Sequence, residues 1–388
     1  MKKILVISPS NKGTIAFCTA NIIQALREAK AEVFPIVLYK EKGGLEVFDN
    51  CRFIIDKSIN PCDNISFIQK LKRFKEYKKE LCPDITISTL ISVNTLNVLS
   101  GGADIKIGVF HSPLEQTKNV SYLNYLRCLL TYRFLFRKLD YLYAVSETTK
   151  KDVEKHIGRN VHVVYNIHNF SEINRLSEAA LSKEEECIFK KPTVLYVGHL
   201  YDTKGVHRLL DAFSKIKKEA NLVLVGSATD GKIPSKYIDI ANNVGIGDKT
   251  FFLGYQSNPY KYMRNCTVFC LPSYSEGLPG VMIEALSLNK RVITTNSSIG
   301  VWEILQCIKD YNEGVKLPFA NELGIIISND DLNKESVNQL TNAIDKELDV
   351  DEKILQFDKS RFEGRSLVKY FTLENNEENV ISNNQNSV

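Results

Sequence analysis

Short runs of apolar and β-branched residues recur along the chain, and stretches with a helical spacing of apolar positions separate them. Near-continuous apolar runs are typical of strands in parallel sheets that helices cover on both faces. The runs are KILVIS, EVFPIVLY, RFIID, ITIST, IKIGVF, YLYAVS and VHVVYN, followed after an interruption by TVLYVG, NLVLVG, TFFLG, TVFCLP, RVITTN and LGIIIS. This alternation predicts an α/β protein with two doubly wound parallel sheets.

The interruption between the two groups of strands is polar and charged, which is typical of a domain boundary. We predict one Rossmann-like domain at residues 1–170, a linker at 171–190 and a second Rossmann-like domain at 191–358, facing each other across a central cleft. A further helical pattern at residues 359–375 is expected to pack back on the first domain. The Asn-rich residues 376–388 are expected to form a disordered tail.

The composition is that of an ordinary globular protein, with 388 residues, 44% hydrophobic and 25% charged. No apolar run approaches the roughly 18 residues that cross a membrane. The first apolar run, ILVI, is short for a signal peptide and predicts a first strand. Nine cysteines without a CxxC pair predict scattered thiols in a reducing cytoplasm, and no zinc site.

The charge is unevenly distributed along the chain. Residues 1–168 contain 25 Lys and Arg against 16 Asp and Glu, so this part has a net charge of +9, whereas the whole chain has a net charge of +4. A basic half favours an anionic partner, such as a phospholipid surface or a lipid diphosphate, and no motif indicates nucleic acid. Two basic segments with interleaved aromatic residues, 69–81 and 122–143, are either core helices with a solvated edge or helices that contact an anionic membrane.

The loops that follow strands are where chemistry is expected, because open α/β sheets bind ligands beyond the carboxyl ends of their strands. The strand TVLYVG ends at Gly198 and leads through His199 to Lys204, at the start of a predicted helix. A lysine beside the free N–H groups of a helix can hold a diphosphate, and His199 can add a donor. The ordinary alternative is a simple turn with a solvated lysine.

The loop after TVFCLP combines a glycine turn with two carboxylates. Gly277 and Gly280 allow the backbone to approach a ligand closely, and the N–H groups of Gly280 and Val281 lie at the positive end of a helix dipole. Glu276 precedes this helix and Glu284 lies inside it, where each can accept hydrogen bonds from hydroxyl groups. An anion site between two hydroxyl acceptors suits a ribonucleoside diphosphate sugar.

The segment EGLPGVMIEAL resembles the E-x7-E signature of retaining glycosyltransferases with the GT-B architecture, in family 4 (glycosyl transferases group 1). The segment YVGHLYDTKGVHRLLDAF is similar to the phosphate-binding segment of the same family. The resemblance implies transfer of a hexose or N-acetylhexosamine from a nucleotide diphosphate sugar, with UDP the expected nucleotide. The implied acceptor is a glycan or a polyprenyl-diphosphate-linked saccharide, in bacterial surface polysaccharide synthesis.

The resemblance also implies roles for individual residues. Glu276 and His111 would contact the transferred sugar, Glu284 would hold the ribose diol, and Lys204 would neutralise the diphosphate. Of these, Glu276, His111 and Lys204 are the expected catalytic residues. The other implied donor-binding positions are Gly13, Gly198, His199, Gly254, Tyr255, Gly277, Leu278, Gly280 and Val281.

The sequence departs from the family pattern at His199, where an arginine is common, and in the first loop, which keeps only Gly13. The remaining histidines are expected to be structural. No carboxylate has the setting of a covalent nucleophile, so attack from the face of the leaving group is expected, without metal or other cofactor. The alternatives are a GT-B sugar-nucleotide epimerase, a phosphorylase, or a non-catalytic nucleotide- or glycan-binding protein. The expected location is the cytoplasm, with peripheral contact at the inner face of the cytoplasmic membrane.

Overall fold

The computed structural model describes residues 2–60, 62, 64–114, 121–228, 231–312, 314–331, 334–350 and 354–373. The chain divides into two compact units. Unit 1 contains the residues up to Asn169 and those from Ser360 onward, and unit 2 runs from Phe170 to Lys359. The expected tail at 376–388 lies outside the described residues.

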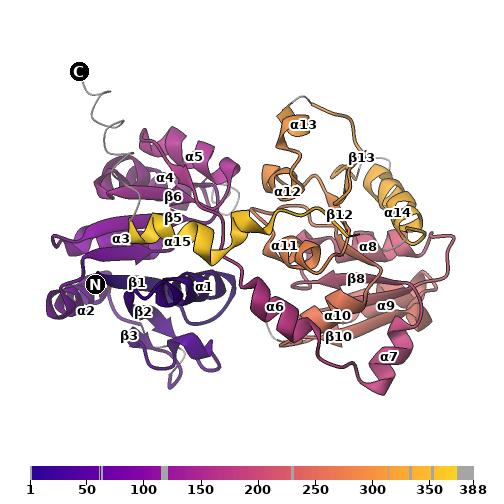
Figure 1. Cartoon of the computed structure of the whole chain (residues 1–388), viewed down its shortest axis with the longest axis horizontal. Coiled ribbons are helices and arrows are strands. Elements are labelled where there is room, and N and C mark those ends of the chain that lie inside the picture. The colour runs from indigo at the N-terminus through magenta and orange to yellow at the C-terminus, as the bar shows by residue number, and fades with distance from the viewer. Residues whose placement is uncertain are drawn as a thin grey trace. The chain divides into compact units, whose positions relative to one another are not determined.

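Unit 1 is built on a seven-stranded parallel sheet with the order β3-β2-β1-β4-β5-β6-β7 (Figure 1). The strands are β1 (Lys3–Ser10), β2 (Glu32–Lys40), β3 (Arg52–Asp56), β4 (Ile85–Ser88), β5 (Ile105–Phe110), β6 (Tyr141–Ala144) and β7 (His162–Val163). The helical segments are α1 (Thr14–Glu28), η1 (Glu46–Phe48), α2 (Phe67–Leu81), α3 (Ile91–Ser100), α4 (Tyr122–Leu130), η3 (Thr131–Leu135), η4 (Phe136–Lys138), α5 (Glu147–Ile157), η8 (Lys359–Phe362) and α15 (Gly364–Thr372).

The apolar run of β1 shows why these residues form a central strand. Successive side chains of a strand point to opposite faces of its sheet. Ile4 and Val6 therefore join the core beneath α1 and α15, while Leu5 and Ile7 join the core beneath α2 and α3. Because both faces are covered, the strand is apolar without alternation, as the sequence pattern indicated.

Helix α15 belongs to unit 1, although it lies at the other end of the described chain. It packs against α1 (Figure 1), and a Cβ at Gly364 would lie 2.8 Å from the Cβ of Ala25. The Tyr143 hydroxyl donates to the carbonyl oxygen of Tyr370 (2.8 Å), and Lys2 Nζ donates to that of Thr372 (2.9 Å). These contacts fix the returning chain to the sheet of unit 1.

Unit 2 repeats the architecture with the strand order β10-β9-β8-β11-β12-β14-β13. Its strands are β8 (Thr193–Val197), β9 (Asn221–Val225), β10 (Thr250–Gly254), β11 (Val268–Leu271), β12 (Val292–Thr295), β13 (Phe319–Ala320) and β14 (Gly324–Ile327). Its helical segments are α6 (Phe170–Ser177), α7 (Lys183–Phe189), η5 (Asp202–Lys204), α8 (Val206–Phe213), α9 (Ser235–Asn243), η6 (Gly247–Lys249), α10 (Tyr260–Asn265), α11 (Gly280–Ser287), α12 (Ile299–Ile304), α13 (Ile308–Asn312) and α14 (Glu335–Glu347). All its strand pairs are parallel except β13 with β14, so the predicted pair of Rossmann-like parallel sheets is confirmed apart from this edge.

Residues 171–190, where the sequence predicted a linker, instead hold the helices α6 and α7 of unit 2. Helix α6 buries Phe170 and Ile173 and packs on α10, and the Asn258 side chain donates to the carbonyl oxygen of Leu176 (2.8 Å). Helix α7 begins with a capping box between Ser182 and Glu185. The sequence analysis did not predict these helices, because the segment has no strand pattern and each helix is short.

Each sheet reverses its strand order at its centre, next to its first strand. In unit 1 this point lies between β1 and β4, and in unit 2 between β8 and β11. At such a point the two neighbouring strands send their chains to opposite sides, which leaves a crevice beyond their carboxyl ends where ligands bind. The loops after β8 and β11 are therefore the first place to look for a site in unit 2.

Candidate active site

Lys204 and Glu276 form an ion pair at the switch point of unit 2. Lys204 ends η5 in the loop after β8, and Glu276 lies in the loop between β11 and α11. The Lys204 Nζ lies 2.8 Å from Glu276 Oε1, with side chains that are 26% and 11% exposed. Two charged groups that are 72 positions apart in sequence are thus held together at a partly covered place, which excludes the alternative of a solvated lysine in a simple turn.

The two loops fit because Gly205 has no side chain. Gly205 has a φ of +67°, and a Cβ there would lie 2.0 Å from the carbonyl oxygen of Pro272 at the end of β11. In addition, the N–H of Tyr274 donates to the carbonyl oxygen of Thr203 (2.9 Å). The glycine therefore meets both a conformational and a steric requirement.

The start of α11 is held from the side of β12. The Ser298 hydroxyl donates to the carbonyl oxygen of Gly277 (2.9 Å), and a Cβ at Gly300 would lie 2.1 Å from the same oxygen. No side chain caps the helix, whose first residues are Gly280 and Val281, both partly exposed. The side chain of Leu278 is buried and packs inside unit 2, so a contact of this residue with a donor would involve its main chain. The first N–H groups of the helix remain suited to an anion.

Glu284 lies inside α11 and is partly buried. Burial raises the pKa of this carboxyl group from 4.5 to about 8, because the surroundings disfavour its charged form. At neutral pH much of Glu284 is therefore protonated and can donate as well as accept a hydrogen bond. The sequence predicted the position of this residue but not its protonation.

Three glycines lie together at the ends of neighbouring strands of unit 2. The N–H of Gly226 donates to the carbonyl oxygen of Gly254 (2.7 Å), and a Cβ at Gly226 would lie 1.8 Å from the carbonyl oxygen of Gly198. The sequence analysis included Gly198 and Gly254 but missed Gly226, which lies between them. Beyond this row, Tyr255 is 75% exposed, so nothing in the described part of the chain covers most of its ring.

His199 is exposed beside the same row, and its ring stacks on Tyr201 with a centroid distance of 5.2 Å and an interplanar angle of 12°. The Tyr196 hydroxyl donates to the carbonyl oxygen of His199 (2.7 Å), which fixes the main chain there. His199 is thus placed with the other unit 2 residues that the sequence predicted.

Gly13 and His111 lie in unit 1, at the carboxyl edge of its sheet. Gly13 follows β1, has a φ of +85° and occupies the N-cap position of α1. His111 directly follows β5, and its buried Nε2 has no hydrogen-bond partner among the described residues. Burial lowers the pKa of His111 from 6.5 to about 4, so the ring is neutral at physiological pH.

The other histidines differ in their surroundings. His156 is buried, and its Nδ1 lies 2.7 Å from the carbonyl oxygen of the residue four positions earlier, as a structural histidine would. The Nε2 of His207 lies 2.9 Å from the hydroxyl of Tyr274, two residues before Glu276, which agrees with the structural role expected for it. The sequence carries no signal for this contact.

The basic segment 122–143 has two different faces. Tyr132 and Phe136 belong to a buried core, whereas α4 itself buries no residue. An outward stripe of large apolar side chains, which we call the α4 apolar stripe, consists of Tyr122 (59% exposed), Leu123 (75%), Leu126 (37%), Leu130 (58%) and Phe134 (67%). Exposed basic residues flank it, namely Arg127, Arg133, Arg137 and Lys138.

The other basic segment, 69–81, forms most of α2 and behaves as a helix with a solvated edge. It buries Phe74, and its Lys78 is also buried, with Nζ 2.7 Å from Asp104 Oδ2. No described helix is both long and apolar enough to cross a membrane. The described residues also contain no group of three or more His, Cys, Asp or Glu side chains placed to hold a metal ion, and the absence of a cofactor stays a prediction.

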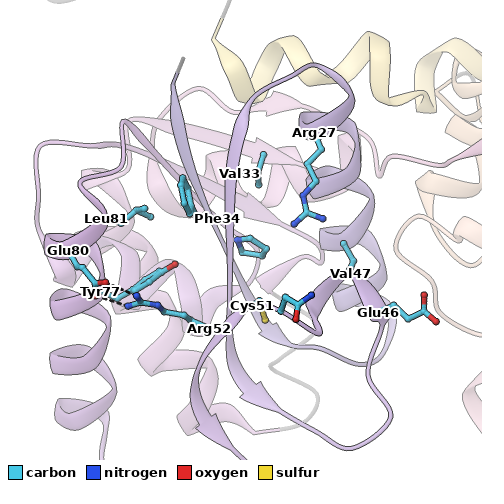
Figure 2. Close-up of a pocket in the computed structure, with 12 residues that line it drawn as sticks. Arg27, Val33, Phe34, Glu46, Val47, Cys51, Arg52, Tyr77, Glu80 and Leu81 are labelled. Atoms are coloured by element: carbon cyan, nitrogen blue, oxygen red, sulfur yellow. Dashed lines mark hydrogen bonds and ion pairs between the residues drawn. The ribbon is translucent and has the colours of Figure 1, made fainter.

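A cavity of about 550 Å³ lies elsewhere in unit 1, at the start of β2 and β3 (Figure 2). It is bordered by Arg27 from α1, by Phe34 from β2 and by Tyr77 from α2. In Figure 2, Arg52 points along Tyr77 toward Glu80, with which it forms an ion pair (2.6 Å). None of the sequence-predicted site residues lines this cavity, which is at the opposite end of the strands from Gly13 and His111.

Residues 179–321, all within unit 2, match the family model of glycosyl transferases group 1. An uncharacterized glycosyltransferase of Methanocaldococcus jannaschii is 27% identical over 269 residues, which cover 66% of this chain and 65% of the relative, slightly less than two thirds of its length. A Campylobacter jejuni enzyme is 24% identical over 278 residues, covering 69% of this chain and 74% of the relative. Its name is N-acetylgalactosamine-N,N'-diacetylbacillosaminyl-diphospho-undecaprenol 4-alpha-N-acetylgalactosaminyltransferase.

Known structures resemble the whole chain. The apo lipopolysaccharide outer core galactosyltransferase WaaB has a TM-score of 0.65 at 20% identity, covering 98% of this chain and 99% of that one. Anabaena HepE in complex with UDP and glucose has a TM-score of 0.69 at 15% identity, covering 99% and 100%. At these identities the likeness establishes the GT-B fold. The family match covers residues 179–321 of the 388, so the chain is similar to glycosyl transferases group 1 within unit 2.

Proposed function

We propose that the protein is a glycosyltransferase that moves a hexose or N-acetylhexosamine from a nucleotide diphosphate sugar, with UDP the expected nucleotide, and that it retains the anomeric configuration. The observation that carries this proposal is the Lys204–Glu276 ion pair beside the uncapped start of α11. Anabaena HepE binds UDP and glucose, which agrees with a nucleotide sugar as donor.

The ion pair explains how the site stays ordered before the donor binds. In the structure, Glu276 neutralises Lys204 at 2.8 Å. A bound diphosphate would replace the carboxylate as the partner of Lys204, and Glu276 would then be free to accept hydrogen bonds from sugar hydroxyls. The same two side chains thus serve the free and the loaded site, at little cost in rearrangement.

Transfer breaks the bond between the anomeric carbon and a phosphate oxygen, so negative charge develops on the departing diphosphate. Lys204 and the N–H groups of Gly280 and Val281, all in unit 2, would stabilise that charge. The acceptor oxygen bonds to the anomeric carbon from the face that the phosphate leaves, and its proton passes to the leaving phosphate oxygen. Glu276 orients the sugar and forms no covalent bond to it.

Glu284 is proposed to bind the ribose diol from within α11. Because the pKa of Glu284 is raised to about 8, its protonated form can donate to one hydroxyl and accept from the other. Gly254 and Tyr255, at the end of β10, are proposed to lie beside the nucleobase. His199, Gly198 and Gly277 are proposed to complete the donor contacts through their exposed ring or main-chain groups.

The proposed acceptor is a glycan or polyprenyl-diphosphate-linked saccharide, since the Campylobacter jejuni relative is named for a diphospho-undecaprenol acceptor. The α4 apolar stripe supports a peripheral contact with an anionic membrane, where such acceptors are embedded. Exposed apolar side chains between cationic ones bind both the acyl boundary and the anionic headgroups. The proposed location is therefore the cytoplasm, at the inner face of the membrane.

The transfer proposal is tested by incubating the full chain with UDP, GDP and ADP sugars, with and without a polyprenyl-diphosphate-linked saccharide. We expect slow nucleotide release alone, fast release with acceptor, and a product whose anomeric configuration, read by NMR, matches the donor. Interconversion of the sugar nucleotide without release would identify an epimerase. Thermal stabilisation by nucleotide without any turnover would identify a binding protein, and either result would reject transfer.

The membrane proposal is tested by flotation with phosphatidylcholine vesicles that contain or lack phosphatidylglycerol. We expect binding only to the anionic vesicles at low salt, and loss of binding when Leu123, Leu130 and Phe134 are changed to serine. Ile238→Ser is the matched control, because Ile238 is an exposed apolar residue of α9 (39% exposed) in unit 2. If the triple variant binds the anionic vesicles as well as the wild type does, the α4 apolar stripe has no role in membrane binding.

A further inference from the structure

Tyr274 is the most extensively held residue of the loop between β11 and α11, and it precedes Glu276 by two positions. Its main chain is fixed on both sides, because its N–H donates to the carbonyl oxygen of Thr203 (2.9 Å) and its carbonyl oxygen accepts from Asn329 Nδ2 (2.7 Å). Thr203 is the neighbour of Lys204. A single peptide segment therefore links the two loops that carry the ion pair.

The side chain of Tyr274 is held as well. Its ring stacks on that of His207, with a centroid distance of 5.7 Å and an interplanar angle of 17°. Its hydroxyl contacts His207 Nε2 (2.9 Å) and the carboxylate of Asp331. These partners belong to α8 and to the segment after β14, so neither is part of the loop that they hold.

Arg208 is the buried support of this arrangement. Its side chain is 1% exposed, and its guanidinium carbon lies 4.0 Å from the centroid of the Tyr274 ring. The same group donates to Asn329 Oδ1 (3.0 Å) and to the carbonyl oxygen of Pro272 (3.3 Å), and it forms an ion pair with Asp331 Oδ1 (2.9 Å). A planar guanidinium can stack and donate at the same time, which a lysine cannot do.

We propose that Tyr274 and Arg208 are positioning residues of the donor site, which hold the loop after β11 so that Glu276 stays within reach of Lys204. Neither residue needs to contact the donor. Arg208 fixes the loop at Pro272 and at the Tyr274 ring, and Tyr274 transmits this position to Thr203 on one side and toward Glu276 on the other. The inference deepens the proposed function and rests on it for the catalytic consequence.

The competing explanation is that these residues only stabilise unit 2. A structural role would lower the melting temperature and the amount of active enzyme, but would leave kcat per folded molecule unchanged. A positioning role would lower kcat at a nearly unchanged melting temperature, because misplacing a reacting group by about 1 Å can cost about 100-fold in rate. The two explanations therefore differ in which measured quantity moves.

The experiment compares Tyr274→Leu with Tyr274→Phe in the full chain. Tyr274→Leu removes the ring and the hydroxyl, and we expect kcat to fall about 10- to 100-fold. Tyr274→Phe keeps the ring contacts with Arg208 and His207 and loses only the hydroxyl, and we expect it to restore kcat to within about threefold of the wild type. Arg208→Lys keeps the charge without the planar stack, and we expect its kcat to lie between those of the two Tyr274 variants.

A second measurement needs no substrate. Amide hydrogen exchange of residues 273–278 should be faster in Tyr274→Leu than in the wild type. It should be unchanged in Lys215→Ala, whose lysine lies just after α8 and pairs with Asp211 of that helix (2.8 Å). Unchanged exchange in Tyr274→Leu, or a loss of activity that follows only the folded fraction, would overturn the inference. If instead the wild type transfers no sugar while exchange rises in Tyr274→Leu, the proposed function fails and the positioning of the loop stands.

Discussion

The two units share the order of their first five strands and a switch point, yet among the described residues only unit 2 shows a charged pair there. In unit 2, Lys204 and Glu276 meet in the loops after the two central strands. In unit 1, the equivalent carboxyl edge carries Gly13 after β1 and the neutral His111 after β5. The fold therefore provides two similar edges, and the side chains on them make the two edges chemically different.

The exposed charges of unit 1 lie instead on its outer helices. Arg127, Arg133 and Arg137 are exposed beside the α4 apolar stripe. If the proposals above hold, the positive charge of unit 2 meets a small anion and that of unit 1 meets a larger anionic surface. The predictions below test this division of roles.

The largest effect is expected for Lys204→Ala. Removing the cation that compensates the leaving diphosphate should lower kcat about 10²- to 10³-fold, as loss of one stabilising donor does in other enzymes. Steady-state assay of nucleotide release measures it, with the surface variant Lys215→Ala as the control. A Lys204→Ala enzyme with the wild-type rate would show that the ion pair of unit 2 has no part in the reaction.

The next effect compares the glycines that follow the first strand of each sheet. Gly13→Ala meets only the conformational penalty of its glycine-specific backbone (φ +85°, ψ 179°), about 1–3 kcal/mol, because nothing lies within 4 Å of its added Cβ. Gly205→Ala meets a penalty for its positive φ and an overlap with the Pro272 oxygen at 2.0 Å, so its cost is expected to be about 2–5 kcal/mol. Urea unfolding of both variants measures the difference, and equal costs would contradict the close fit of the unit 2 loops.

A smaller effect concerns the pH dependence of stability through Glu284. Its pKa rises from 4.5 in the unfolded chain to about 8 in the folded one, so the folded state binds a proton that the unfolded state has lost. The stability that this group contributes is full below pH 4.5 and is lost as the pH rises toward 8. As the pH rises from 4.5 to 8, the melting temperature of Glu284→Gln should therefore increase relative to that of the wild type. A constant difference across this range would show that Glu284 titrates normally.

The smallest effect is the opposite pH dependence in unit 1. The pKa of His111 falls from 6.5 to about 4 on folding, so its contribution is present above pH 6.5 and is lost as the pH falls toward 4. His111→Gln should lose less stability than the wild type over that interval, measured by melting temperature. The same variant should leave the shape of the pH–rate profile above pH 7 unchanged, and a new limb there would argue against a neutral His111.

The sequence predicted the strands well because the central strands of parallel sheets are apolar on both faces. It did not predict α6 and α7, which are short helices in a polar and charged segment, nor the antiparallel edge strand β13, which has only two residues. The capping box of Ser182 with Glu185 was the one signal that could have marked α7.

The candidate site was predicted as separate residues and not as an arrangement. The turn glycines and the two glutamates are visible in the sequence because their local pattern is unusual. The contact of Lys204 with Glu276 depends on how strands β8 and β11 come to be neighbours, which no local pattern contains. Arg208 and Tyr274 were missed because a buried arginine and a stacked tyrosine look in sequence like any surface residue of a helix or loop.

The return of the chain to unit 1 at Ser360 has a practical consequence for dissecting the enzyme. Residues 170–359 form one uninterrupted stretch, whereas the sheet of unit 1 takes part of its cover, including Leu367 and Phe371, from the far side of that stretch. Unit 2 can thus be excised by two cuts without breaking its own chain. Shortening the chain before α15 would instead remove an apolar layer from the core of unit 1.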